Sequence, residues 1–251
     1  DKISAKIDSE NISSVLLDVR DKHEVDKTFK KYKPDIILHA AALKHVPICE
    51  NHPSDAMKTN IIGTKNISEK AIKYRPETMV LISTDKAVDP TNFMGASKRA
   101  AEIYIQNLDR EKSYTDFVTV RFGNVLGSTG SVIPLFQNQI SRGGPLRVTH
   151  KETTRFFMSV KEAVELVLIS LNSSINKKEK GDINVLEMGE PMKIDNLAKQ
   201  LARLSGLTPG KDIKIIYTGL RVGEKLHEKL FHKEEDKITT SHPDILIAKS
   251  R

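Results

Sequence analysis

The stretch TMVLISTDKAVDPTNFMGASKRAAE, residues 78–102, decides the fold that the sequence predicts. Residues 78–82 form an almost continuous apolar run, as expected of a strand that is buried on both faces of a parallel sheet. The polar run 83–86 follows at the strand's carboxyl end, and a helix-forming segment begins near Gly95. This order is typical of a doubly wound α/β sheet, whose ligand sites lie at that edge.

Strand-like and helix-like segments alternate on both sides of this stretch. The predicted strands are residues 14–21, 34–42, 78–84 and 116–123, and the predicted helices are residues 23–32, 54–74 and 95–112. Repeated β-α-β units imply a parallel sheet with helices on both faces. After about residue 127, glycine, serine and proline cluster and shorter elements follow, which indicates a smaller lobe.

We therefore predict a Rossmann-like, doubly wound parallel sheet in residues 1–127. Residues 128–251 are predicted to form mainly a small α/β substrate-binding lobe, interwoven with the sheet. A dinucleotide-binding sheet normally begins with a strand, a glycine-rich turn and a helix whose N-terminus holds the pyrophosphate. No such unit precedes residue 14, so we expect the sheet to be N-terminally incomplete, without its first βαβ unit.

Composition excludes several classes of protein. The 251 residues carry a net charge of +7, but the lysines are interspersed with acidic residues and there is no tryptophan, which argues against a nucleic-acid partner. The apolar stretch 164–171 is too short to span a bilayer, and we expect no membrane segment in this chain. The single cysteine and the histidine spacing indicate no metal site. We expect a cytoplasmic protein, with the soluble part of a membrane-anchored protein as the alternative.

Five segments together resemble the polysaccharide-biosynthesis branch of the extended short-chain dehydrogenases. They are residues 39–67, 83–102, 121–140, 154–163 and 219–230, in that order. More narrowly, they are similar to the UDP-N-acetylglucosamine 4,6-dehydratases that retain configuration at C5. The resemblance covers roughly residues 14–248. It implies a tightly bound and recycled NAD cofactor, a UDP-sugar substrate and a homo-oligomer.

The reaction that this resemblance implies is a redox-neutral dehydration. A UDP-N-acetylhexosamine, expected to be UDP-N-acetylglucosamine, becomes a 4-keto-6-deoxy sugar for surface polysaccharide or glycan synthesis. Oxidation at C4 by NAD acidifies the C5 proton, a base removes it, water leaves from C6, and C6 is then reduced. By the resemblance, Asp85 protonates the leaving 6-hydroxyl, Lys86 removes the C5 proton, and Lys98 hydrogen-bonds the nicotinamide ribose.

Met94 stands where short-chain dehydrogenases usually carry a tyrosine, four residues before Lys98. Its thioether cannot transfer a proton, and the nearest hydroxyl groups in the sequence belong to Ser83 and Thr84. We expect Thr84 to orient the sugar's 4-hydroxyl, or to relay its proton towards Lys98, a water or Asp85. The same departure from tyrosine belongs to the C5-retaining branch, and an inactive enzyme is the alternative interpretation.

The resemblance also assigns binding residues. The expected cofactor contacts, besides Lys98, are Asp18, Val19, His39, Ala40, Ala41, Ala42, Asn60 and Ser83. The expected substrate contacts are Lys44, Asn124, Arg155, Arg221 and Glu224. The alanines would let the cofactor approach the backbone closely, and the arginines suit a diphosphate because a guanidinium can donate two parallel hydrogen bonds.

Two other functions remain open from the sequence. A UDP-sugar 4-epimerase would also use NAD, but it needs no base at C5, so it leaves the pair Asp85–Lys86 unexplained. A non-catalytic module that binds nucleotide sugars is the other alternative, and it is motivated by the absence of the glycine-rich phosphate turn.

Overall fold

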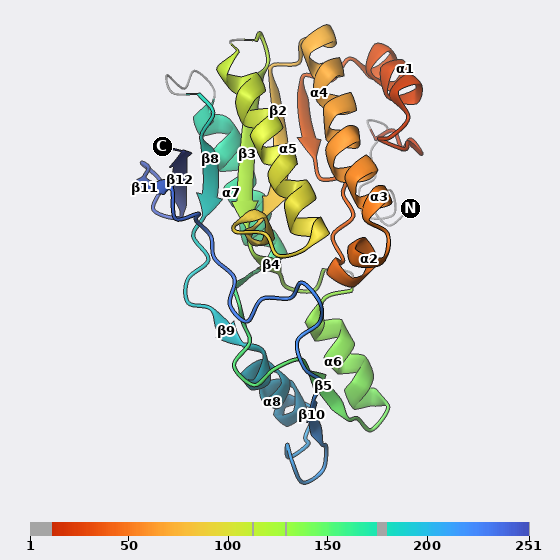
Figure 1. Cartoon of the computed structure of the whole chain (residues 1–251), viewed down its shortest axis with the longest axis vertical. Coiled ribbons are helices and arrows are strands. Elements are labelled where there is room, and N and C mark those ends of the chain that lie inside the picture. The colour runs from red at the N-terminus through yellow and green to blue at the C-terminus, as the bar shows by residue number, and fades with distance from the viewer. Residues whose placement is uncertain (1–11, 112, 129, 175–179, 251) are drawn as a thin grey trace.

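A six-stranded sheet forms the larger part of the fold (Figure 1). In this computed structural model, residues 12–250 are described, except for residues 112, 129 and 175–179. Across the sheet the strands are β1 (Ile36–His39), β2 (Thr78–Thr84), β3 (Asp116–Phe122), β8 (Ile183–Leu186), β12 (Ile245–Ser250) and β11 (Glu235–Thr239). The first four are parallel, whereas β12 runs antiparallel to β8 and β11 antiparallel to β12. The predicted parallel α/β architecture is confirmed.

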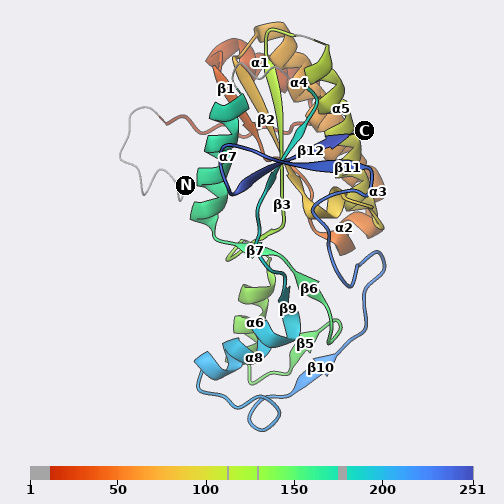
Figure 2. The same cartoon turned by 90° about the vertical axis from the view of Figure 1, so that its left-hand side faces the viewer.

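Helices cover both faces of this sheet (Figure 2). One face carries α1 (Lys22–Tyr32), α4 (Gly63–Tyr74) and α5 (Phe93–Arg110), and the other carries α7 (Val160–Ser174). Ahead of α4 lie α2 (Val46–Asn51), α3 (Pro53–Met57) and the π-helical segment η1 (Lys58–Ile62). The helix that the sequence predicts over residues 54–74 therefore forms, with one π-helical turn inside it.

Burial on both faces explains why the strand in the deciding stretch is so apolar. Successive strand residues point to opposite faces. Met79 and Leu81 accordingly pack with residues of α1, α4 and α5, while Val80 packs with residues of α7. All three side chains are 0% exposed, so no position of this run is free to be polar.

The smaller lobe projects from the carboxyl edge of the parallel strands (Figure 1). Its elements are β4 (Asn124–Val125), α6 (Val132–Ser141), β5 (Leu146–Val148), β6 (Thr154–Arg155), β7 (Phe157–Met158), β9 (Met192–Lys193), α8 (Ile194–Leu204) and β10 (Ile215–Tyr217). A separate apolar cluster that includes Phe136, Leu146 and Ile213 holds the lobe together. Since α7, β8, β11 and β12 return to the large sheet, residue 127 does not separate two independent bodies.

The strand that the sequence predicts at residues 14–21 is wrong. Residues 12–18 form no ladder with any described strand, and Asp21 instead caps α1 by accepting hydrogen bonds from the backbone of His23 and Glu24. Leu17 and Val19 still pack against the apolar cluster beneath α1 and α4. Val15 and Leu16 are exposed, so the apolar pattern of this segment marks neither a strand nor continuous burial.

A buried ionic cluster joins the sheet to α5. The Arg121 guanidinium is 0% exposed; it donates to Glu102 on α5 at 2.8 and 3.0 Å and to Glu235 on β11 at 2.7 and 3.0 Å. Arg99 also donates to Glu102, at 2.9 Å, so two cations face two carboxylates. A buried charge is tolerated only when it is paired in this way. The nearby positive charges, with Arg121 foremost, hold the pKa of Glu102 below its usual range despite its burial.

Replacing this central cation should destabilise the fold strongly. In Arg121→Met two buried carboxylates lose their main partner, and we expect the free energy of unfolding to fall by about 3–5 kcal/mol in urea denaturation. The control is Lys27→Ala, which removes an exposed ion pair with Glu24 and should cost less than about 1 kcal/mol. A loss below about 1 kcal/mol in Arg121→Met would contradict the account.

Candidate active site

Thr84, Asp85 and Lys86 meet around one carboxylate oxygen at the carboxyl end of β2. Thr84 ends the strand, and the 3₁₀ turn η2 (Asp85–Ala87) follows it. The Thr84 hydroxyl donates to Asp85 Oδ1 at 2.9 Å, and Lys86 Nζ donates to the same oxygen at 3.0 Å. Asp85 is 0% exposed and the Lys86 side chain 16% exposed. A hydroxyl, a carboxylate and an amine are thus connected by two hydrogen bonds in a site that is largely shielded from solvent.

The surroundings of Asp85 and Lys86 come from distant parts of the chain. Lys86 Nζ also donates to Asn124 Oδ1 at 3.2 Å and lies 3.9 Å from Glu228 Oε1. Asp85 Oδ2 has no hydrogen-bond partner among the described residues. It faces Gly123, where an added Cβ would stand 3.2 Å from this oxygen. The sequence predicted Asn124 as a sugar ligand, but it gave no signal for Glu228.

Helix α5 packs directly on the η2 turn. A Cβ at Gly95 would lie within 2.2 Å of the Lys86 carbonyl oxygen, so only glycine permits this approach. One turn further along, the buried Lys98 Nζ donates to the Ile82 carbonyl of β2 at 2.5 Å. Burial lowers the pKa of Lys98 to about 8, while the Glu102 carboxylate acts in the opposite direction. Lys98 is therefore held close to the end of β2.

Met94 lies in an apolar cluster and takes no part in the polar contacts. Its side chain is 3% exposed and packs with Cys49 and Ala56, against partly buried Leu43 and Val46. The residue that stands in the place of the usual tyrosine thus anchors α5 to α2 and α3. Among the described residues, the hydroxyl that donates to Asp85 is that of Thr84.

His39 and Asn60 support the loop that follows β1. Asn60 uses both ends of its amide on the backbone of Leu43, at 2.8 and 3.0 Å, and donates to Ser97 on α5 at 2.8 Å. His39 Nε2 lies 3.0 Å from the Thr64 hydroxyl, whose hydrogen is donated to the Asn60 carbonyl. His39 must therefore donate from Nε2. Burial, helped by the charge of Lys98, lowers the pKa of His39 to about 4.

The residues expected to hold NAD differ in how far they are exposed and in whether their side chains already have a hydrogen-bond partner. Ala40 and Ala41 are exposed and Ala42 is half-buried, which leaves backbone open to a ligand. Asp18 is exposed beside its partner Arg20, and Val19 packs against Gly63 at the start of α4. The Ser83 hydroxyl instead donates to Glu102 at 2.7 Å. The small residues after β1 and the buried amine of Lys98 fit a bound dinucleotide.

Four of the residues expected to bind the substrate lie in the lobe, whereas Lys44 lies in the loop between β1 and α2. Arg155 is buried and pairs with Glu224 at 2.9 Å, while the Glu224 carboxylate also accepts from the backbone of Arg221. Asn124 connects this group to Lys86, and β4 pairs with β7 next to Arg155. Arg221 and Lys44 are exposed. The structure joins Asn124 to Lys86 and Arg155 to Glu224, and it leaves the cations Arg221 and Lys44 open to solvent.

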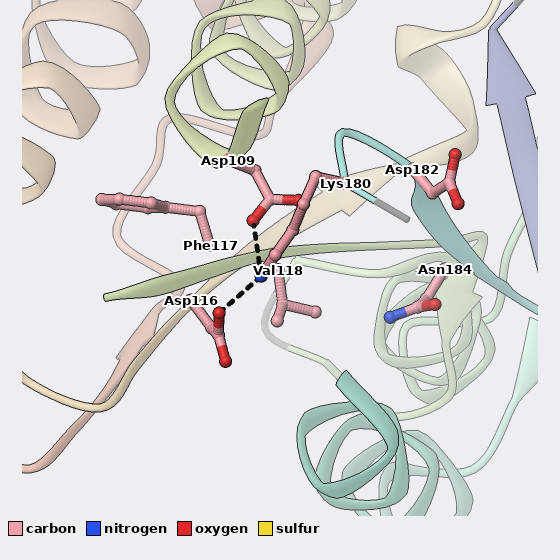
Figure 3. Close-up of a pocket in the computed structure, with 7 residues that line it drawn as sticks. All are labelled: Asp109, Asp116, Phe117, Val118, Lys180, Asp182 and Asn184. Atoms are coloured by element: carbon pink, nitrogen blue, oxygen red, sulfur yellow. Dashed lines mark hydrogen bonds and ion pairs between the residues drawn. The ribbon is translucent and has the colours of Figure 1, made fainter. Parts of the chain in front are cut away.

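A small hollow at the opposite edge of the sheet is filled by its own charges. In Figure 3, Lys180 lies between Asp109 and Asp116, and its ammonium contacts their carboxylates at 3.5 and 2.5 Å. Asp116 begins β3, whereas Asp85 and Lys86 follow the far end of the neighbouring strand β2. The hollow is therefore an ion-paired structural site, separate from the candidate active site.

The chain matches one protein family over nearly its whole length. The model of the family described as "Polysaccharide biosynthesis protein" matches residues 2–250. The capsular polysaccharide biosynthesis protein CapD of Staphylococcus aureus is 51% identical over 88% of this chain, which spans 36% of CapD. A solved structure of Pen from Bacillus thuringiensis superposes with a TM-score of 0.88 at 33% identity, covering 99% of this chain and 74% of Pen.

Two relatives carry names that describe an activity. A UDP-glucose 4-epimerase of Rickettsia canadensis is 40% identical over 87% of this chain and 61% of its own length. An inverting UDP-N-acetylglucosamine 4,6-dehydratase of Campylobacter jejuni is 37% identical over 88% of this chain and 63% of its own length. Among the described residues, no helix is long and apolar enough to span a membrane, and no cluster of histidine, cysteine and carboxylate side chains could hold a metal ion.

The neutral His39 should make the fold sensitive to mild acid. Its pKa in the folded state is about 4, below the ordinary 6.5, so the unfolded chain takes up a proton first as the pH falls. Stability is therefore lost between about pH 6.5 and pH 4, by about 2 kcal/mol from pH 7 to pH 5. Urea unfolding at both pH values tests this, with His39→Gln as the comparison, because glutamine can donate to Thr64 without titrating. Equal losses in both proteins would show that another group is responsible.

Proposed function

Because the chain belongs to the polysaccharide biosynthesis protein family, we propose that it carries the catalytic residues of an NAD-dependent nucleotide-sugar 4,6-dehydratase. The expected substrate is UDP-N-acetylglucosamine and the expected product its 4-keto-6-deoxy derivative. The observation that carries this proposal is the contact of Thr84 and Lys86 with a single oxygen of Asp85. Elimination of water requires both a base at C5 and an acid at C6, and this contact places both groups together.

Two proton transfers would prepare Asp85 and Lys86 for these roles. In water an aspartate and a lysine form an ion pair, which gives neither an acid nor a base. Lys86 would lose its proton to solvent as the substrate binds, and Asp85 would gain one from the sugar's 4-hydroxyl through Thr84, which leaves a neutral amine 3.0 Å from a carboxylic acid. Loss of water around such a pair favours the neutral forms, because charges lose more solvation than neutral groups. A sugar that covers the exposed part of Lys86 would have this effect.

Thr84 supplies the route for the proton of the 4-hydroxyl. Its own hydrogen is directed at Asp85 Oδ1, so its oxygen can accept a hydrogen bond from the sugar. Of the three acceptors that the sequence left open, this geometry favours Asp85. One proton then enters through Thr84 and one leaves with the 6-hydroxyl as water, while Lys86 takes and returns the C5 proton. The three residues are unchanged after a turnover.

NAD, when bound, would supply the oxidation at C4 and the reduction at C6. Lys98 and the small residues 40–42 would hold its nicotinamide end beside β2, and Asp18 and Val19 its adenine end. The buried Lys98 amine has two hydrogens left after its bond to Ile82, enough to bind a ribose hydroxyl. A solved UDP-glucose 4-epimerase of Thermus thermophilus in complex with NAD shares this fold, with a TM-score of 0.74 at 19% identity over 88% of this chain and 77% of its own.

The direct test is the product formed from UDP-N-acetylglucosamine. A longer version of the protein that includes the glycine-rich cofactor turn should convert this sugar to a 4-keto-6-deoxy product, recognised in NMR spectra by the new C6 methyl group. UDP-glucose serves as the comparison substrate. If neither sugar loses water, while the protein is folded and binds NAD, the proposed function is wrong.

Side-chain replacements should separate the roles of Thr84 and Lys86. Lys86→Met keeps most of the side-chain stem but removes the amine, and we expect kcat to fall by about 10²–10⁴-fold. Thr84→Val removes the hydroxyl at nearly constant volume, and a loss of about 10²-fold is expected. Steady-state kinetics should show smaller changes in KM, because neither group is expected to bind the nucleotide. Thr28→Val on the outer helix α1 is the control, and an effect of Thr84→Val no larger than this control would refute the relay.

A UDP-sugar 4-epimerase is the second candidate, and the similarity to the Rickettsia protein favours it. Epimerisation would invert C4 and leave the 6-hydroxyl in place. It needs no base at C5, so it would give the Asp85–Lys86 contact no chemical task. The same NMR experiment separates the two, since an epimerase product keeps its C6 hydroxymethyl group.

A further inference from the structure

A segment of the lobe, residues 223–232, lies across the loop that carries the catalytic residues, and we name it the strap. The contacts are Thr91 and Asn92 donating to the Gly223 carbonyl, Lys225 donating to the Val88 carbonyl, and Lys229 and His232 contacting the Asp89 carboxylate. A Cβ at Gly223 would lie 2.6 Å from that of Asn92. The strap is thus fitted closely to the loop 85–92.

Glu228 is the residue of the strap that faces the catalytic pair. It is 8% exposed, and its Oε1 lies 3.9 Å from Lys86 Nζ. Its Oε2 is buried without a hydrogen-bond partner in the described part of the chain, 3.5 Å from Lys225 Nζ. Burying a carboxylate with so few hydrogen bonds is unfavourable. Fold stability therefore does not explain why a glutamate occupies this place.

We propose that Glu228 is a positioning residue whose fixed negative charge stabilises Lys86 as it becomes an ammonium ion. The inference rests on the proposed function. In the elimination the C5–H bond breaks and an N–H bond forms on Lys86 Nζ. The electron pair forms the C5–C6 double bond, and the C6–O bond breaks as the oxygen takes the proton of Asp85.

At that moment Asp85 is a neutral acid and offers the new ammonium no full counter-charge. Glu228 is the next carboxylate from Lys86 in the described residues, and the Lys225 amine lies 3.5 Å from its other oxygen. A negative charge that is already in place where positive charge develops lowers the barrier without reorganisation. The strap thereby connects the lobe to the reactivity of Lys86.

Kinetics of three variants in the longer, NAD-containing protein test this role. Glu228→Gln keeps the shape but removes the charge, and we expect kcat to fall by about 10–100-fold with KM changed less than about threefold. Glu228→Asp restores the charge at a greater distance from Lys86, and its kcat should lie between those of Glu228→Gln and the wild type. Lys229→Gln, which removes an exposed strap–loop ion pair, is the matched control and should keep the wild-type kcat.

A second measurement needs no turnover. Limited acetylation, quantified by peptide mass spectrometry, reports how much of each lysine is an uncharged amine. Relative to exposed Lys161, Lys86 should be labelled more in Glu228→Gln than in the wild type, by about 3–10-fold, because a stabilising negative charge is gone. Unfolding would also raise the labelling of Lys86, so the labelling of the buried Lys98 in Glu228→Gln is the control and should stay at its wild-type value.

The outcomes separate the two proposals. Unchanged kcat and unchanged Lys86 labelling in Glu228→Gln overturn the role of Glu228 and leave the dehydratase function standing. A wild type that makes no 4-keto-6-deoxy sugar, with labelling that still rises in Glu228→Gln, overturns the function and supports the contact. If Glu228→Gln does not fold, kcat and Lys86 labelling are measured in Glu228→Asp instead. Wild-type values of both quantities in that variant overturn the inference.

Discussion

The buried guanidinium of Arg121 holds together the parts on which the site depends. Through Glu102 it fixes α5, and Glu102 in turn holds Ser83, the residue before Thr84. Through Glu235 and the Leu230 carbonyl it fixes β11 and the end of the strap. Five donors in one plane can serve several acceptors at once, which a lysine could not do. The active site is therefore assembled around a cation that lies outside it.

The proposed proton transfers depend on three neighbouring groups, the Thr84 hydroxyl, the Asp85 carboxylate and the Lys86 amine. Asp85 Oδ1 receives hydrogen bonds from both an alcohol and an amine, so a proton can reach or leave Asp85 in two directions. Gly95 makes this possible, because any side chain there would push the η2 turn away from α5. Met94 fills an apolar cluster between helices. The place of the usual tyrosine has become part of the core, and proton transfer is assigned to the end of β2.

Sequence patterns predicted the local features well, and the failures have a common cause. The run from β2 to α5 is contiguous, so its apolar periodicity, its polar turn and its helix could be recognised directly. Residues 14–21 had the composition of a strand, but a strand also needs a neighbour, which composition does not report. The cofactor contact of Ser83 stays a prediction, but the hydrogen bond from its hydroxyl to Glu102, 19 residues further on, could not be read from the sequence. Glu228 lies 142 residues from Lys86, and no spacing rule connects the two.

The central claim is that Lys86 removes the C5 proton and returns one to the same face of the sugar. The measurement that tests it most directly is turnover of UDP-N-acetylglucosamine in heavy water, with the product analysed by NMR. The lysine amine exchanges with solvent, so the account predicts a 4-keto-6-deoxy product that carries deuterium at C5 with unchanged configuration. A product without deuterium at C5, or a C4 epimer that retains its 6-hydroxyl, would contradict it.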